Sequence, residues 1–434
     1  MKKLQISNTA KAILPAIILI PISIQLISNL HIGGISTLCS FFTAAIHPST
    51  NQNVINNSWH GLQITLCIAT IAWCISISFG ILLGILSSYS INNILGVSRI
   101  ITTTIRRLLT LPRATHELLW GLLLLQIFGL APWIAIIAIS IPYASLMERI
   151  FAEQIDLQSF NDIQAIKQTG AAKTQILVTA LLPKIIPFIG TYGCYRLECA
   201  VRGATLLGIF GLGGIGTELQ LSTLSMKFDE MWTSLWMLFI TIFLLEKLLE
   251  RMQKPRYYFN KIGEYTLYCF AFIFSLFILN LFWIRSLGIN ILDSFEIHLV
   301  SLPTLESFSI AISTLPWLSL IWETLLLTFL AACIAISLPP ILLMLCPTSY
   351  VEQVISTIWI FCRLIPPPLS SILLLLCIQP NISVAAIALG IQNMGVLGRI
   401  LKESLDKNNT EVFNAISSTG AKSQSSWLYG KLCF

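Results

Sequence analysis

Long runs of apolar residues alternate along the chain with short polar segments. A helix needs about 20 apolar residues to cross the roughly 30 Å hydrocarbon core of a bilayer. Ten runs near this length occur, at residues 12–30, 60–86, 108–129, 131–147, 184–206, 231–249, 264–284, 321–346, 357–378 and 381–396. The pattern predicts an all-α, polytopic membrane protein with about ten transmembrane helices. An alternative is that the two runs flanking Pro132, and the two flanking Pro380, each form one long kinked span.

Lysine and arginine residues predict the orientation of these spans. The first run follows Lys2 and Lys3, and we expect a retained signal-anchor helix rather than a cleaved signal peptide. Segment 31–58 holds no Lys or Arg, whereas four later polar segments each hold four or five such residues. These basic segments are 87–113, 148–184, 247–261 and 397–434. Because basic loops stay in the cytoplasm, the N-terminus is expected to be cytoplasmic.

Composition narrows the class of protein further. Hydrophobic residues make up 55% of the chain and charged residues 11%, against about 25% charged in soluble domains. This excludes disorder, a collagen and a nucleic-acid-binding domain, and it argues against a cytosolic enzyme; the lipid bilayer is the expected environment. The 11 cysteines form no CxxC and the 5 histidines match no metal site, so we expect no disulfide, metal or other cofactor. No nucleophile and base occur together, so no catalytic residue is proposed.

An internal repeat divides the chain. Residues recur 250 positions later: Arg149 as Arg399, Glu153 as Glu403, Asp156 as Asp406, and Thr169-Gly170-Ala171 as Thr419-Gly420-Ala421. We expect a first repeat over residues 1–260 and a second over 261–434. The second repeat is interpreted as truncated, because it stops two residues after Leu432, the counterpart of Leu182. Parallel repeats are typical of transporters, in which two similar halves enclose a path.

The basic segment 153–183 has an unusual amphipathic pattern. A short helix would place Ile163 and Ile166 on one apolar face, and Gly170 permits a turn before a second helix that runs to Leu182. An exposed apolar face favours docking into a partner's groove. The alternative is that this face packs on the protein's own helices.

This segment resembles the EAA coupling loop of ABC importer permeases. The resemblance lies in the spacing from Ala165 to Gly170, followed by Leu182-Pro183, and in the second repeat it includes Ala415 and Gly420. It implies a coupling helix that docks on a cytoplasmic ABC ATPase. The glutamate of that loop is replaced by Gln164 and Asn414, so we expect docking by shape and apolar contact. The chain has no GxxxxGK[ST] phosphate loop, so ATP hydrolysis is expected on a separate chain.

Charged residues inside the run 184–206 are the candidate translocation path. Glu198 and Arg202 are spaced to pair on one helix face, whereas Arg196 lies about 200° away from Glu198 and needs another partner. Two arginines against one glutamate leave a positive excess that would attract an oxyanion. The alternative is a charge network that fixes helix packing. Glu117 and Glu323 lie near span ends, where the side chain is expected to reach water.

A glycine-rich stretch follows these charges. Gly211, Gly213, Gly214 and Gly216 break the helical pattern, and a mobile hinge near the external mouth is the functional interpretation. Tight helix packing is the alternative. A dinucleotide fingerprint is not indicated, because no βαβ pattern surrounds the stretch.

The whole stretch YRLExxVRxxxxLGxxGxGGIGxEL, from Tyr195 to Leu219, resembles the phosphonate permease family of ABC importers. The resemblance implies a fold of two tandem MetI-like permease repeats in the bacterial inner membrane. It also implies ATP-driven alternating access that imports phosphonate or a related oxyanion, with a periplasmic substrate-binding protein as second partner. The alternatives are a permease for another small solute such as methionine, a proton- or sodium-coupled transporter, and a non-transporting truncated remnant. Pairing of two chains as a homodimer also stays open.

Overall fold

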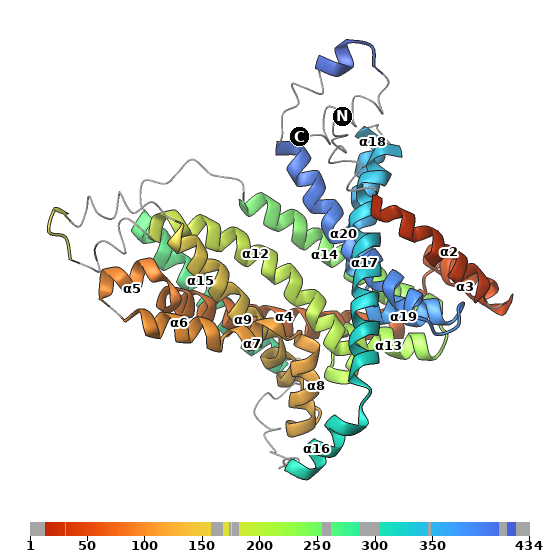
Figure 1. The fold of residues 1–434 in the computed structure, drawn as a ribbon, viewed down its shortest axis with the longest axis horizontal. Helices are drawn as coiled ribbons and strands as arrows, with labels where there is room; N and C mark the ends of the chain where they lie inside the picture. The colour runs from red at the N-terminus through yellow and green to blue at the C-terminus, as the bar shows by residue number, and fades with distance from the viewer. Residues whose placement is uncertain are drawn as a thin grey trace, which may run out of the picture. The chain divides into compact units, whose positions relative to one another are not determined.

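The computed structural model describes residues 14–30, 32–96, 98–157, 168–172, 175, 182–253, 262–286, 304–345, 349–407 and 415–421 (Figure 1). Within these residues the regular elements are helices, apart from one isolated bridge between Leu30 and Ile378. The predicted all-α fold is therefore confirmed. The chain forms two compact units, one of residues 48–301 and one of residues 1–47 with 302–434.

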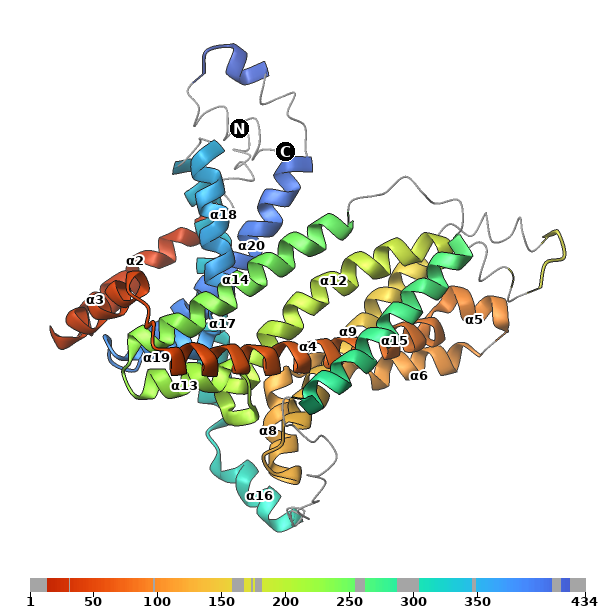
Figure 2. The ribbon, with the colours of Figure 1, turned by 180° about the vertical axis from the view of Figure 1, so that it is seen from behind.

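The unit of residues 48–301 is built around a long central helix, α4 (Gln52–Ser87). Its other helices are α5 (Tyr89–Leu95), α6 (Arg99–Leu108), α7 (Thr110–Ala114), α8 (Glu117–Phe128), α9 (Pro132–Asp156), α12 (Leu182–Leu207), α13 (Ile215–Leu224), α14 (Phe228–Gln253) and α15 (Ile262–Ser286). Helix α4 packs along α9, and α12, α13, α14 and α15 also contact it (Figure 2). A side chain at Gly80 would clash with Met147, at 2.5 Å, so glycine allows the close approach of α4 and α9.

The apolar runs around the two prolines form separate helices. Gly129 ends α8, and Pro132 is at the first position of α9, where a missing N–H costs nothing. Near Pro380, α19 (Pro367–Leu375) and α20 (Ile382–Lys407) are likewise distinct. Two helices at each place, rather than one kinked span, are therefore what the chain forms.

Five described helices are long and apolar enough to cross a membrane: α4, α9, α14, α17 (Trp317–Leu345) and α20. The number rises to seven if two bent pairs each count as one span. Those pairs are α12 with α13, bent by 55°, and α18 (Ser349–Leu364) with α19, bent by 89°. The other predicted runs fall on apolar helical stretches within Leu14–Ser28, Glu117–Phe128 and Ile273–Ser286, the last being the part of α15 whose side chains are described. The polytopic membrane class is confirmed, with five to seven full spans among the described residues.

The second unit joins the start of the chain to its last third. It holds η1 (Leu14–Ile18), α2 (Leu19–Ser28), α3 (Ile32–Ile46), α16 (Leu305–Thr314), α17, α18, α19 and α20. Helix α17 packs along α20, and η1 contacts α17. Ser383 Oγ donates to Gln25 Oε1 at 2.6 Å, which ties α2 to α20. These units follow spatial contacts; the repeat boundaries 1–260 and 261–434 remain a prediction from the sequence.

Helix starts nevertheless recur at the spacing of the sequence repeat. Helix α8 begins at Glu117 and α19 at Pro367, and α9 begins at Pro132 and α20 at Ile382. Each pair is 250 residues apart. The recurrence supports the predicted duplication.

Candidate functional site

The predicted coupling loop is only partly within the described residues. Ile163, Ala165 and Ile166 lie outside them, as do the side chains of Leu182 and Pro183, whose backbone starts α12. Gly170 has a φ of 78° and Gly420 a φ of 79°, the left-handed conformation that ends a helical turn. Ala415 is exposed on the turn before Gly420. The two predicted loops thus share their backbone conformation at the glycine, while docking on an ATPase remains a prediction.

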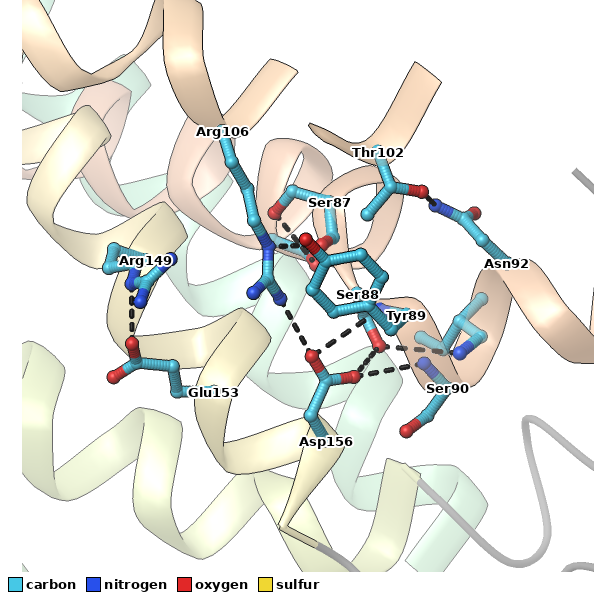
Figure 3. A network of polar contacts seen from close by, with 12 residues as sticks. Ser87, Ser88, Tyr89, Ser90, Asn92, Thr102, Arg106, Arg149, Glu153 and Asp156 are labelled. Atoms are coloured by element: carbon cyan, nitrogen blue, oxygen red, sulfur yellow. Dashed lines mark hydrogen bonds and ion pairs between the residues drawn. The ribbon is translucent and has the colours of Figure 1, made fainter. Parts of the chain in front are cut away.

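A polar network lies at the end of α9, around Asp156 (Figure 3). The Asp156 carboxylate accepts from Ser88 Oγ at 2.7 Å, from the Ser90 backbone N–H at 2.9 Å and from Arg106 Nη2 at 2.7 Å. Arg106 Nε also donates to the Ser87 carbonyl at 2.7 Å. The end of α9 is thereby fixed to the α4–α5 junction and to α6.

Sequence reasoning did not assign a role to this network. In the sequence, Asp156 stands out only as the counterpart of Asp406, and Arg106 lies in the basic segment 87–113. Since 50 residues separate the two, no local pattern pairs them. The one usable signal was the recurrence of an acid at the end of an apolar span.

The charges of α12 are arranged as two separate groups. Arg202 Nη2 donates to Glu198 Oε1 at 3.3 Å, as the spacing predicted, and the two side chains are 15% and 3% exposed. Arg202 Nε is buried and has no hydrogen-bond partner among the described residues. Glu198 therefore orients the guanidinium and leaves one of its donors unused.

Arg196 finds the different partner that its position on the helix required. Its Nε and Nη2 donate to the Tyr192 hydroxyl at 2.8 and 2.6 Å. Its guanidinium carbon lies 5.3, 5.1 and 5.8 Å from the ring centres of Tyr143, Tyr192 and Tyr195. Aromatic faces attract a cation at this range, so the charge of Arg196 is held by three tyrosines.

Glu117 joins this cluster, although the sequence indicated a side chain reaching to water. The side chain is 13% exposed, and a Cβ at Gly203 would lie 3.2 Å from its Oε1 and 3.5 Å from the Tyr143 hydroxyl. Glu117 thus approaches α12 at Gly203. The cluster then includes Glu117 and Glu198 beside Arg196 and Arg202, and the role of the α12 charges as a translocation path remains a prediction.

The glycine-rich stretch forms the bend between α12 and α13, through a π-helical turn, η3 (Gly208–Leu212). Gly211, Gly213 and Gly214 have φ values of 91°, 93° and 90°, which side chains rarely adopt. Ile215 N–H donates to Thr65 Oγ1 at 2.9 Å, which fixes the bend against α4.

Packing is tight on one side of the bend and open on the other. A Cβ at Gly216 would overlap the Thr205 carbonyl and lie 2.6 Å from Ile209 N. A Cβ at Gly211 would meet only Leu130, at 3.6 Å. Tight packing therefore explains Gly216, whereas the hinge interpretation remains open for Gly211 and Gly213.

Among the described residues, no group of three or more His, Cys, Asp or Glu side chains is placed to hold a metal ion. None of the cysteine side chains described there is in a disulfide. The chemistry that the site offers is thus hydrogen bonding and charge, supplied by arginine, glutamate and tyrosine.

Comparison with known proteins finds similarity to transport proteins. Residues 77–254 match the family model "Binding-protein-dependent transport system inner membrane component". The putative phosphite transport system permease protein HtxE of Stutzerimonas stutzeri is 28% identical over 156 residues, 36% of this chain and 60% of that protein. The putative cryptic phosphonate transport system permease protein PhnE2 of Escherichia coli (strain K12) is 28% identical over 118 residues, 27% of this chain and 97% of that protein.

A similar solved structure is the inward-facing MetNI methionine ABC transporter. It is 18% identical, with a TM-score of 0.40, over 46% of this chain and 96% of that one. The chain therefore spans 60% of the length of HtxE.

Proposed function

We propose that this chain is the permease subunit of an ABC importer, because residues 77–254 match the model of binding-protein-dependent transport system inner membrane components. Its proposed cargo is a phosphonate or a related phosphorus oxyanion, such as phosphite or phosphate. The similarity to permeases named for phosphite and phosphonate transport supports this cargo. The chain itself is a transport subunit, and ATP hydrolysis belongs to a partner ATPase.

The main structural support for the proposed cargo is the hydrogen bonding of the Arg202 guanidinium. Its Nη2 is held by Glu198, and its buried Nε has no partner among the described residues. A guanidinium offers its donors in a planar fork that matches the oxygens of a tetrahedral oxyanion. An oxyanion that reached α12 would satisfy the unused donor, while Glu198 kept the guanidinium in position.

Transport is proposed to proceed by alternating access. A periplasmic binding protein delivers the cargo, and an ABC ATPase in the cytoplasm moves the coupling segments around 160–182 and 410–432. Gly211 and Gly213 allow the α12–α13 bend to change, because their backbone conformation is one that only glycine adopts readily. The N-terminus is proposed to be cytoplasmic in a bacterial inner membrane, and pairing of two chains is an alternative assembly.

Uptake of radiolabelled phosphite and methylphosphonate tests the proposal, in cells that lack other importers of these anions. Arg202→Ala removes a charge-assisted hydrogen bond worth about 1.5–3 kcal/mol. The half-saturating concentration should therefore rise by about 10- to 150-fold. Arg202→Lys, which keeps the charge but not the fork, should fall between.

Lys227→Ala is the matched control for charge. The hydrogen bond and the negative charge of Glu230 raise the pKa of Lys227, so this variant also removes one full positive charge, at an exposed site between α13 and α14. It should transport like the unmodified chain. Unchanged uptake by Arg202→Ala at every concentration would remove Arg202 from the path. Uptake that persists without the ATPase but stops with an uncoupler would favour an ion-coupled transporter instead.

A further inference from the structure

The end of α9 is the point at which a moving cytoplasmic segment would have to act on the bundle. Asp156 is the last residue of α9, and segment 153–183 continues from it. A helix end with no cross-contacts would bend there, and movement of the segment would be lost as local flexing. The contacts of Asp156 therefore decide how much of that movement reaches the spans.

Asp156 makes four hydrogen bonds, and all of them come from other elements. The donors are Ser88 Oγ at 2.7 Å, the backbone N–H of Ser90 at 2.9 Å, the backbone N–H of Tyr89 at 3.4 Å and Arg106 Nη2 at 2.7 Å. A carboxylate that accepts several such bonds is held in one position. The end of α9 is thus fixed to the junction where α4 ends and α5 begins.

Arg106 extends the same contact to α6. Besides Asp156, it donates through Nε to the Ser87 carbonyl at 2.7 Å, and its guanidinium carbon lies 4.1 Å above the centre of the Tyr89 ring. The side chains of Arg106 and Asp156 are 12% and 21% exposed, so water and salt screen the pair only weakly. One ion pair therefore joins α4, α5, α6 and α9.

A second ion pair on α9 gives the contrast. Arg149 and Glu153 pair within the helix, one turn apart, and their side chains are 39% and 45% exposed (Figure 3). Such an exposed pair within one helix fixes nothing outside it and contributes little. Glu153 and Asp156 thus lie within one turn of each other on α9. Of these two, Asp156 is the one whose carboxylate bonds to residues outside α9.

We infer that Asp156 is a positioning residue for energy coupling. Together with Arg106 it holds the end of α9, where segment 153–183 begins, against α4, α5 and α6. Displacement of the segment would therefore move these helices together. This inference rests on the proposed function as an ATP-driven permease. It assigns Asp156 no contact with the cargo or with ATP. Its role is to keep α9 from bending at the point where the segment leaves it.

The test uses the complete transporter in proteoliposomes, with the partner ATPase and the binding protein, and compares Asp156→Asn with Glu153→Gln. Both variants remove one negative charge from the last two turns of α9. The readout is the ratio of ATPase activity with phosphite-loaded binding protein to activity without it, per assembled complex. For Asp156→Asn the ratio should fall about tenfold, on the scale of weakening a hydrogen bond to a charged group. Glu153→Gln should keep the ratio of the unmodified complex.

Stability is measured in parallel, because a merely structural role would lower the melting temperature and leave the ratio per complex unchanged. That result, or an unchanged ratio with unchanged stability, would overturn the inference. Asp156→Glu keeps the charge and should restore part of the ratio. Failure of the proposed function has a different signature: the unmodified complex itself would show no ATP-dependent uptake.

Discussion

Replacing Gly216 with alanine should destabilise the unit of residues 48–301 by about 3 kcal/mol, at the upper end of the cost of overpacking. The added Cβ would overlap the Thr205 carbonyl oxygen and lie 2.6 Å from Ile209 N and 2.7 Å from the Gly208 carbonyl carbon. All three neighbours are backbone atoms of the α12–η3 turn, so no side chain can rotate away to make room. The turn itself has to move, against the packing of α12 on α4.

The melting temperature of the purified chain in detergent measures this effect, because its 11 tryptophans report unfolding by their fluorescence. At about 2–4 °C per kcal/mol for a unit of this size, the midpoint should fall by about 6–12 °C. Gly211→Ala is the matched comparison. It meets only Leu130 Cδ1, at 3.6 Å, and its cost of about 1–2 kcal/mol comes from its φ of 91° alone.

The comparison also separates the two interpretations of the glycine-rich stretch. If tight packing governs Gly216 and flexibility governs Gly211, Gly216→Ala shows the larger loss of stability, whereas Gly211→Ala loses more uptake than its smaller loss of stability explains. A Gly216→Ala midpoint within about 2 °C of the unmodified chain, less than 1 kcal/mol, would refute the steric reasoning.

Two further predictions concern single polar groups in the same unit. Thr65→Val removes the hydroxyl that accepts from Ile215 N–H at 2.9 Å, so a thermal melt should show a loss of stability of about 1–3 kcal/mol. Thr70→Val is the control, because the Thr70 hydroxyl donates only to carbonyls of its own helix, and it should change stability little. Glu148→Gln should not lower the melting temperature, because both buried Glu148 oxygens lack a hydrogen-bond partner within the described part of the chain and Arg113 Nη1 lies 3.9 Å away, beyond hydrogen-bond distance. A large loss would mean that the pair carries a stabilising charge interaction.

The sequence by itself determined the features that depend on neighbours along the chain. Apolar runs fixed the helices and the membrane class, and spacing of four residues paired Glu198 with Arg202. Gly170 and Gly420 adopt the left-handed turn that their place after a short helix indicated. Each of these follows from helix geometry, which repeats every few residues and can be read locally.

Only the tertiary structure decided which distant segments meet. It brought Glu117 of α8 close to Gly203 of α12. It joined Arg106 to Asp156, and Thr65 to Ile215 across 150 residues. It also packed α15 on α4, within the unit of residues 48–301. These pairings depend on the fit of whole helix surfaces, where small residues such as Gly80 allow another helix to approach closely. A local sequence pattern does not specify which helix will pack there.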